Sequence, residues 1–294
     1  MIVIARNYGQ LGNRLFLYAH LIAAAQEYQC TLANPCFGEY AHLFPATAND
    51  LWCRYPIVDS NATPPSLRQR RLLSQSVYLG TRALSLLGLK RYPMNILRLR
   101  EQQTCDLNGP GFKSLAKQSR PLLAQGWLFR SDELVRKHTD AIRDHFSIQQ
   151  TDQAHVDQTI DRIRQNADVV VGVHIRHGDY ATFQGGKFFY PVKQYATWMR
   201  QVAEQLGNRR VAFLVCSNAK IAVDDFAGLD VHNGPGHIVQ DMYCFANCDW
   251  LIGPPSTYTL WAAFYGNVPL HVMQSTEQTV DLQSAKANSA SHAA

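Results

Sequence analysis

The stretch DVVVGVHIRHGDY, residues 168–180, decides the fold because it changes within a few positions from a strand pattern to a charged loop. Its first half is rich in β-branched side chains, namely Val169, Val170, Val171, Val173 and Ile175. A short run that is apolar on both faces is typical of a central strand in a parallel sheet. Its second half carries the polar side chains of His174, Arg176, His177, Asp179 and Tyr180. Ligands bind outside the carboxyl ends of such strands, so this loop is a candidate binding site.

Arg176 is the side chain in this loop best suited to an anion. A guanidinium presents paired donors that match phosphate oxygens, and it stays charged at any working pH. A rigid strand would hold it at the edge of the sheet. The alternative is an ordinary strand end with a surface ion pair between Arg176 and Asp179, and these residues alone leave both interpretations open.

The residues after this loop alternate between helical and strand patterns. The pattern predicts helices at 194–206, 241–247 and 256–266, and strands at 211–216, 250–253 and 269–273. Such alternation is typical of a doubly wound parallel sheet. Ser217 follows one of these strands, and Ser256 and Thr257 follow another at the start of a helix, so they would converge with Arg176 on a diphosphate site. Ser256 also fits a simple helix N-cap.

The first 166 residues predict a second α/β region. A strand at 1–5 is followed by the loop RNYGQLGN at 6–13 and by a helical stripe, so Gly9 and Gly12 would let the backbone approach a ligand. The spacing matches neither GxGxxG nor GxxxxGK[ST], and a plain tight turn remains open. Further along, the pattern predicts a strand at 122–129, a helix at 132–146 capped by Ser131, and a helix at 155–166.

Composition limits the class of protein. With 294 residues, 46% of them hydrophobic, the chain can bury a full core and fits two domains. Its seven cysteines are scattered without a CxxC spacing, which argues against a disulfide framework or a zinc site and for reduced thiols in a cytoplasm. The start lacks a signal-peptide pattern, and the longest largely apolar run, 15–25, is too short to span a bilayer.

One segment is strongly basic. Residues 60–100 contain no Asp or Glu and carry eight Lys or Arg, so the rest of a chain with net charge +5 sums to −3. Leucines recur between these charges at roughly helical spacing. The segment could contact an anionic membrane surface, a lipid diphosphate or nucleic acid, or it could be a solvated helix that packs through its leucines.

Four segments together resemble a known enzyme family. HIRHGDY, residues 174–180, resembles the HxRRxD motif of the α-1,2 and α-1,6 fucosyltransferases and the protein O-fucosyltransferases. GQLGNRLFLYAH, GWLFRSDELV and DMYCFANCDWLIGPPSTYTLWAAF are similar to three further segments of that family, in the same order over about residues 6–268. The resemblance is most specific to the bacterial α-1,2-fucosyltransferases.

This resemblance implies a GT-B-like α/β fold, in which two Rossmann-type domains face a cleft. We assign 1–160 to an acceptor-side domain, 161–275 to the GDP-sugar domain and 276–294 to a frayed tail. The implied reaction is an inverting transfer of L-fucose from GDP-fucose, with no cofactor and no obligatory metal. The chain also lacks a DxD triplet, the usual handle for a metal-bound nucleotide sugar.

The resemblance also assigns roles to single residues. Arg176 falls on the arginine that grips the donor diphosphate, with His174 beside it. Asp241 aligns with the acid at the guanine end, and Asn13 with a loop asparagine facing the cleft. The predicted donor-binding set is Asn13, His174, Arg176, Ser217, Asp241, Ser256 and Thr257. His177 replaces the second arginine of HxRRxD, and Pro255 and Tyr258 alter the late segment, which leaves the acceptor and the exact donor sugar open.

Chemistry gives the catalytic hypothesis. Breaking the bond from C1 to phosphate leaves negative charge on GDP, which Arg176 can stabilise. Asp179 or His177 could act as general base on the acceptor hydroxyl, and Asp179 could instead only orient Arg176. We take Arg176 and Asp179 as the catalytic residues.

We therefore expect a hexosyltransferase that moves fucose to a sugar hydroxyl, α-1,2 on galactose of a glycan or of a lipid-linked oligosaccharide. A different GDP-sugar, or a non-catalytic glycan- or nucleic-acid-binding relative, remains as the alternative. We expect no nucleic-acid partner for the enzyme, a cytoplasmic location, and a peripheral contact through 66–100 with an anionic inner membrane face.

Overall fold

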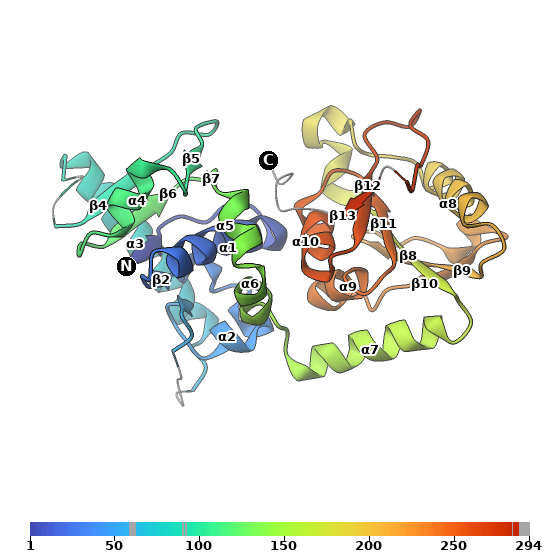
Figure 1. The fold of residues 1–294 in the computed structure, drawn as a ribbon, viewed down its shortest axis with the longest axis horizontal. Helices are drawn as coiled ribbons and strands as arrows, with labels where there is room; N and C mark the ends of the chain where they lie inside the picture. Colours follow the sequence, from blue (N-terminus) through green and yellow to red (C-terminus); the bar gives the residue numbers. More distant parts are fainter. Residues whose placement is uncertain (59–62, 90, 92, 284, 288–294) are drawn as a thin grey trace. The chain divides into compact units, whose positions relative to one another are not determined.

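The computed structural model describes residues 1–58, 63–89, 91, 93–283 and 285–287. The chain divides into two compact units, residues 1–149 and the residues from 150 onward, and each is described by itself (Figure 1). This division comes earlier than the predicted one between residues 160 and 161. The reason is that helix α7, Gln150–Arg164, packs on the second unit, where Arg164 pairs with Asp249 at 3.0 Å.

Unit 1 is built on a five-stranded sheet with the strand order β3-β2-β1-β6-β4. Neighbouring strands are parallel except for β2 and β3. Its elements are β1 (Ile2–Ile4), α1 (Leu11–Glu27), β2 (Leu32–Ala33), 3-10 turns at Pro35–Phe37 and Ala41–Leu43, α2 (Pro45–Ala48), β3 (Arg54–Tyr55), α3 (Leu67–Leu86), β4 (Asn95–Arg98), β5 (Cys105–Asp106), α4 (Pro110–Ala116), β6 (Leu122–Gln125), β7 (Phe129–Arg130), α5 (Asp132–Lys137) and α6 (Thr139–His145).

Two of the segments predicted in unit 1 are broken in the structure. The strand expected at 122–129 stops after Gln125, and β7 begins only at Phe129. Gly126, between them, lies so close to Leu99 that a Cβ would be 2.6 Å from the leucine Cβ. The helix expected at 132–146 begins as predicted, with Oγ of Ser131 accepting a hydrogen bond from the Leu134 amide at 3.3 Å. It is then interrupted at His138, so that α5 and α6 are separate helices.

Unit 2 contains a six-stranded sheet with the order β10-β9-β8-β11-β12-β13. All neighbours are parallel except β12 and β13. After α7 its elements are β8 (Val169–Ile175), 3-10 turns at Gly178–Ala181 and Phe183–Gly186, α8 (Val192–Leu206), β9 (Val211–Ser217), a 3-10 turn at Val223–Phe226, β10 (Asp230–Asn233), α9 (Ile238–Phe245), β11 (Trp250–Gly253), α10 (Thr257–Gly266), β12 (Pro269–Val272) and β13 (Lys286–Ala287).

Strand β8 is central and wholly buried, as its β-branched sequence predicts. The next two strands of the chain, β9 and β10, lie on one side of it, and β11 and β12 lie on the other. The sheet therefore reverses its direction of growth between β8 and β11. The carboxyl ends of these two strands form the topological switch point, where open α/β sheets bind ligands.

The tail was predicted to be frayed, but the part of it that the structure describes, residues 276–283 and 285–287, is folded onto unit 2. Val280 and Leu282 are buried in the core of unit 2, which also contains Trp198 and Met199. Gln205 holds this segment by donating to the carbonyl oxygen of Val280 at 2.6 Å and accepting from the amide of Leu282 at 3.0 Å. β13 then pairs with β12. Residues 284 and 288–294 of the predicted tail lie outside the described residues.

The sequence also led to expectations about membrane-spanning segments and cysteines. None of the helices in the described part of the chain is long and apolar enough to cross a membrane. All seven cysteines are free thiols, five of them buried.

Candidate functional site

The strand register of unit 2 brings the predicted polar residues to one edge of the sheet. Ile175 of β8 lies opposite Ser217 of β9, and Val173 lies opposite Ile252 of β11. The residues that follow these strands therefore leave the sheet side by side: Arg176 after β8, Asn218 after β9, and the turn of residues 254–256 after β11. The structure thus places Arg176 and Ser256 at the switch point, and Ser217 borders Arg176 from β9.

Arg176 is held by two neighbours from its own loop. Its Nη2 donates to Oδ2 of Asp179 at 3.0 Å, and its guanidinium carbon lies 5.3 Å from the ring centroid of Tyr180. The Arg176 side chain is 17% exposed, whereas that of Asp179 is 54% exposed. The arginine is thus largely desolvated and fixed in direction, and the carboxylate remains open to solvent.

Tyr180 connects this loop to the start of helix α10. Its hydroxyl donates to the carbonyl oxygen of Pro255 at 2.7 Å. Because the same ring lies under Arg176, one side chain sets the position of the arginine relative to the turn before α10. No role was predicted for Tyr180 from the sequence. The available signal was its position four residues after Arg176, in a short 3-10 turn where a large aromatic ring is buried.

Ser256 is the N-cap of α10, as one of its two interpretations predicted. Its Oγ accepts a hydrogen bond from the Tyr258 amide at 3.3 Å, and Thr257 is the first helical residue. The first amides of a helix lack intrahelical acceptors and carry the positive end of the helix dipole. The start of α10 therefore adds anion-binding capacity beside Arg176, whether or not the Ser256 hydroxyl itself contacts a ligand.

His174 is buried in β8 and does not face the loop. Its Nδ1 is hydrogen-bonded to Oγ1 of Thr259, and its ring centroid lies 5.3 Å from that of Tyr258. Burial, and secondarily the charge of Arg176, lower the pKa of His174 to about 3, so the ring is neutral at any working pH. In this structure His174 fastens β8 to α10.

His177 is also committed to the protein. Its Nε2 donates to the carbonyl oxygen of Tyr190 at 2.8 Å, and its ring stacks on Phe189 with centroids 4.4 Å apart. A neutral imidazole that donates through Nε2 keeps only Nδ1 as a base. Asn218 completes this side of the site by accepting a hydrogen bond from the His177 amide at 2.9 Å.

Asp241 lies on α9, at the carboxyl ends of β9 and β10. Its Oδ1 accepts a hydrogen bond from the Gly236 amide at 2.8 Å. Gly234, just after β10, is pressed between Asp241 and Cys216, since a Cβ there would be 2.8 Å from the carboxylate and 2.5 Å from the sulfur. Burial raises the pKa of Asp241 to about 6. Helix α9 begins three residues before the predicted start, so Asp241 lies within it.

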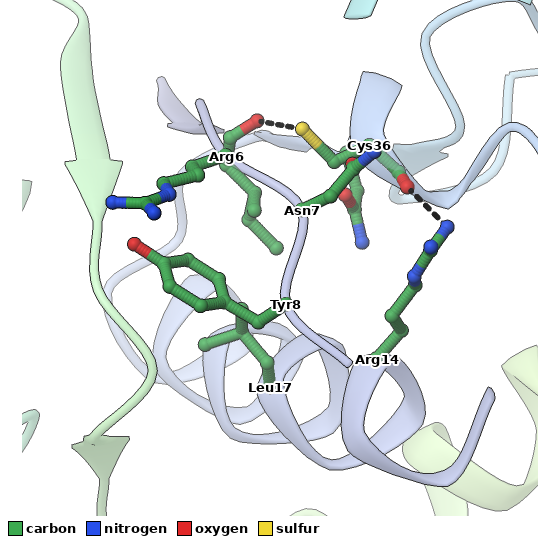
Figure 2. A pocket seen from close by; sticks show the side chains of 8 residues that line it. Arg6, Asn7, Tyr8, Arg14, Leu17 and Cys36 are labelled. Carbon is green, nitrogen blue, oxygen red and sulfur yellow. Dashed lines mark hydrogen bonds between the residues drawn. The ribbon is translucent and has the colours of Figure 1, made fainter. Parts of the chain in front are cut away.

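Unit 1 carries its own hollow at the carboxyl ends of β1 and β2 (Figure 2). Its cavity volume is only about 10 Å³, and it is lined by Ile4, Arg6, Asn7, Tyr8, Arg14, Leu17, Asn34 and Cys36. Loop 6–13 was predicted to approach a ligand, but its association with Arg14, Asn34 and Cys36 in one hollow was not predicted. Its signal was the polar run Arg6, Asn7 and Tyr8 directly after the first strand.

The polar groups of the hollow are unevenly satisfied. Figure 2 shows Arg6 beside Tyr8 on one side, 5.3 Å from the ring centroid, and Arg14 near Cys36 on the other. Arg14 donates to the carbonyl oxygen of Cys36 at 3.2 Å and pairs with Glu39 at 3.1 Å. Oδ1 of Asn34 is buried and has no hydrogen-bond partner. A buried acceptor without a partner lowers the stability of the fold.

Asn13, the remaining predicted donor residue, lies in the first turn of α1 in unit 1. Gly9 turns the loop with φ +56°, and a Cβ at this glycine would overlap Nδ2 of Asn13. The glycine is therefore needed for both its conformation and its lack of a side chain.

Within the described ranges, no three His, Cys, Asp or Glu side chains lie where they could jointly hold a metal ion.

Solved structures show which fold this is. Arabidopsis thaliana FUT1, solved as a mutant in complex with GDP, is 13% identical, with a TM-score of 0.62 over 97% of this chain and 73% of that one. The Bradyrhizobium α-1,6-fucosyltransferase NodZ, soaked with GDP-fucose, is 17% identical, with a TM-score of 0.54 over 92% of this chain and 94% of that one. POFUT1 in complex with GDP is 14% identical, with a TM-score of 0.52 over 92% of this chain and 98% of that one.

These likenesses confirm the expected GT-B-like class of fold, with a Rossmann-type sheet in each unit. No curated protein matches the sequence. The sequence does match Glycosyl transferase family 11 over residues 127–290, more than half of the chain, and this range contains every helix and strand of unit 2. The resemblance read from the four motifs is thereby confirmed, and the chain belongs to Glycosyl transferase family 11.

Proposed function

We propose that this protein is an inverting fucosyltransferase that moves L-fucose from GDP-fucose to a hydroxyl group of an acceptor sugar. The observation that carries the proposal is Arg176, held by Asp179 and Tyr180 at the switch point of unit 2 and tied to the turn that starts α10. Its support is that FUT1, NodZ and POFUT1, which share the fold, were solved with GDP or GDP-fucose.

The donor would lie along the carboxyl edge of the unit 2 sheet. Arg176 and the first amides of α10, with the hydroxyls of Ser256 and Thr257, supply positive charge and hydrogen bonds for a diphosphate. Ser217 borders this position from β9. Asp241, at the ends of β9 and β10, offers a carboxylate to the two N–H donors on the edge of a guanine base. His174 would act by holding β8 against α10.

In the proposed step, the acceptor oxygen bonds to C1 of fucose while the bond from C1 to the diphosphate oxygen breaks. The electron pair of the broken bond goes to GDP, where Arg176 stabilises it in a site that excludes much of the water. Asp179 takes the proton of the acceptor hydroxyl, because its carboxylate is solvent-accessible and fixed by Arg176. Nδ1 of His177 is the second choice. The guanidinium and the α10 dipole supply the charge that a metal would otherwise provide.

The acceptor is proposed to contact unit 1, with the hollow at β1 as its contact point. Arg6, Asn7 and Tyr8, which line the hollow, offer polar groups to a ligand with hydroxyl groups. As the specific reaction we propose an α-1,2 linkage to galactose, in a glycan or in a lipid-linked oligosaccharide. Its basis is the closer resemblance of the sequence motifs to the bacterial α-1,2 enzymes.

The test is product analysis. The protein is incubated with GDP-fucose and a panel of galactosides, and products are identified by mass and linkage; GDP-mannose is the competing donor. A fucosylated galactoside, abolished by Arg176→Lys and retained in the exposed control Arg162→Lys, supports the proposal. Transfer from GDP-mannose alone contradicts the fucose assignment. Donor binding without transfer to any acceptor, and without slow hydrolysis, would indicate a non-catalytic relative.

A further inference from the structure

Helix α3, Leu67–Leu86, is labelled in Figure 1. The sequence left open whether this helix packs through its leucines, and in the structure several of them are exposed to solvent. The inner face contains Val77, which packs on the core strands of unit 1, and only Arg70 and Thr81 are fully buried. Leu72, Leu79 and Leu86 are 54%, 58% and 79% exposed. Leu67 is also 50% exposed, so four leucines of the helix are exposed and the helix does not pack through all of its leucines.

The rotation of α3 is fixed from its inner side. The Arg70 guanidinium donates to the carbonyl oxygens of Thr47 at 3.2 Å, Ala48 at 2.6 Å and Asp50 at 2.9 Å. Gly38 lies against the same side chain, where a Cβ would be 2.7 Å from that of Arg70. Turning Arg70 outward would leave the carbonyl oxygens of Thr47, Ala48 and Asp50 without this donor, so these hydrogen bonds keep the outward leucines outward.

Leu72, Leu79 and Leu86 are seven residues apart and so share one face of the helix. Arg68 lies one turn before Leu72, and Arg82 lies one turn after Leu79; both are exposed, as is Arg71. We call these six residues, Arg68, Arg71, Leu72, Leu79, Arg82 and Leu86, the outward stripe. The helix contains no Asp or Glu, and the apolar surface continues into exposed Leu87 and Leu89.

The chemistry of the stripe selects among possible partners. In a two-fold contact between copies of this chain, arginines would face arginines with no carboxylate on the helix to pair with them. Nucleic acid would take the arginines and leave the central leucines exposed to water or to phosphate. An anionic bilayer satisfies both kinds of group, because leucines enter the acyl boundary while arginines contact the headgroups. We propose that the outward stripe of α3 docks this protein on an anionic lipid bilayer.

One contact links helix α3, which carries the outward stripe, to the hollow of unit 1. Ser74, on the inner side of α3, donates to Sγ of Cys36 at 3.6 Å, and Cys36 also lines the hollow. A docked α3 would therefore hold the hollow close to the lipid surface. This last consequence rests on the proposed function and would bring a lipid-linked acceptor to unit 1.

The test is co-sedimentation with vesicles of phosphatidylcholine alone and of phosphatidylcholine with phosphatidylglycerol, without donor or acceptor. Binding is expected only to the anionic vesicles and is expected to weaken at high salt, since exposed charges are screened. Arg68→Gln with Arg82→Gln should lower the partition coefficient roughly 30-fold, from the contribution of two basic residues near an anionic leaflet. Leu72→Ser with Leu79→Ser and Leu86→Ser should lower it on the order of tenfold or more.

The matched control is Arg162→Gln with Arg209→Gln, which removes the same charge from exposed positions of unit 2 and should bind like the wild type. Far-UV circular dichroism and transfer to a soluble acceptor verify that each variant is folded. Equal binding to both vesicle types, or equal loss in the control, overturns the proposal. So does a dimer in sedimentation equilibrium that the leucine variant abolishes, or salt-sensitive binding to duplex DNA or to RNA that exceeds binding to the vesicles. Since no sugar is transferred in the assay, its failure would leave the proposed function standing.

Discussion

The sheets of the two units have a similar strand arrangement, but different side chains lie at the carboxyl ends of their strands. In each, the first strand is central and the later strands are added on both sides. At the end of β8 the charged groups are paired with each other, as Arg176 is with Asp179. At the end of β1 the hollow contains two arginines and a buried acceptor, Oδ1 of Asn34, that has no partner. The charged groups of the first edge therefore satisfy each other, while the second edge keeps one buried acceptor without a partner.

The family match divides the chain in a similar way. It covers all the elements of unit 2, whereas in unit 1 it reaches only β7, α5 and α6. The hollow and the outward stripe both lie outside it. Unit 2 is thus the part that the family defines, and unit 1 is where we expect acceptor and location to be set. The following experiments test this division.

The largest effect is expected at the end of β8. Arg176→Lys keeps the charge but loses the paired donors and the planar contact with Tyr180. Removing such a transition-state contact should lower kcat by on the order of 10²–10³-fold, with the acceptor KM nearly unchanged. Steady-state kinetics beside the control Arg162→Lys measure this. If Arg176→Lys turns over at the wild-type rate, the carboxyl edge of unit 2 does not depend on this arginine for catalysis.

The next effect concerns stability. Burial raises the pKa of Asp241 to about 6, above its ordinary value of 3.8. The folded protein therefore keeps a proton that the unfolded chain loses, so this group makes stability fall as pH rises from about 4 to 6. Asp241→Asn should remove that fall and stabilise the protein at pH 7 by on the order of 2–3 kcal/mol, while weakening GDP binding. Urea unfolding from pH 4 to 8 and calorimetric titration with GDP measure the two effects.

His174 also contributes to the dependence of stability on pH, and its contribution must be distinguished from that of Asp241. Burial lowers its pKa to about 3, so stability from its neutral form is present above the ordinary value of 6.5 and is lost as pH falls toward 3. The two groups thus act in opposite directions between pH 4 and 6. The comparison of wild type with Asp241→Asn isolates the carboxylate, since His174 is present in both proteins. Parallel stability curves would show that Asp241 does not carry the raised pKa.

A smaller effect is expected for Tyr180→Phe. The ring under Arg176 remains, but the hydrogen bond to the Pro255 carbonyl is lost. Loss of one such bond should lower kcat/KM for GDP-fucose roughly tenfold. Tyr180→Ala, which also removes the ring, should be worse. If Tyr180→Phe behaves like the wild type, the hydrogen bond does not position the arginine.

In unit 1 the expected effect is smaller again and falls on the other substrate. Arg6→Gln should raise KM for the acceptor about fivefold while leaving kcat and KM for GDP-fucose within error, from loss of one peripheral hydrogen bond. Arg209→Gln serves as its control. If the KM for GDP-fucose rises instead, the hollow contributes to donor binding. That result would contradict the expectation that unit 1 contacts the acceptor.

No effect is expected from a chelator. The proposed chemistry takes its positive charge from Arg176 and α10, so EDTA should leave the initial rate unchanged. Loss of activity with EDTA and its return with magnesium or manganese would show that the donor site needs a metal.

The sequence predicted features that depend on local pattern. The β-branched run of β8 and the cap at Ser256 need only a few neighbouring residues, and both are confirmed. Most elements of unit 2 followed from the alternation of patterns, although β10, Asp230–Asn233, has too few apolar residues to be recognised. The site followed only in part: a linear motif shows that Arg176 and Tyr180 are near each other, but not that Tyr180 reaches Pro255.

What the sequence could not predict depends on distant residues. The leucines of α3 suggested a packing face, whereas burial of Arg70 is made possible by three carbonyl oxygens around residues 47–50. The polar composition after Gln274 suggested a frayed tail, whereas Gln205 on α8 binds that segment. The hollow of unit 1 needs Asn34 from a second strand. In each case the deciding partner lies far away in sequence.

The closing of unit 2 by residues 280–287 has a consequence for how the protein is made. Unit 1 has all of its residues once Gln149 has been synthesised, so it can fold while the ribosome is still translating. Unit 2 lacks Val280, Leu282 and the strand β13 until the last of these leaves the ribosome, and its core under α8 stays open until then. Truncation of the nascent chain before residue 280 should therefore yield a folded first half attached to an aggregation-prone second half.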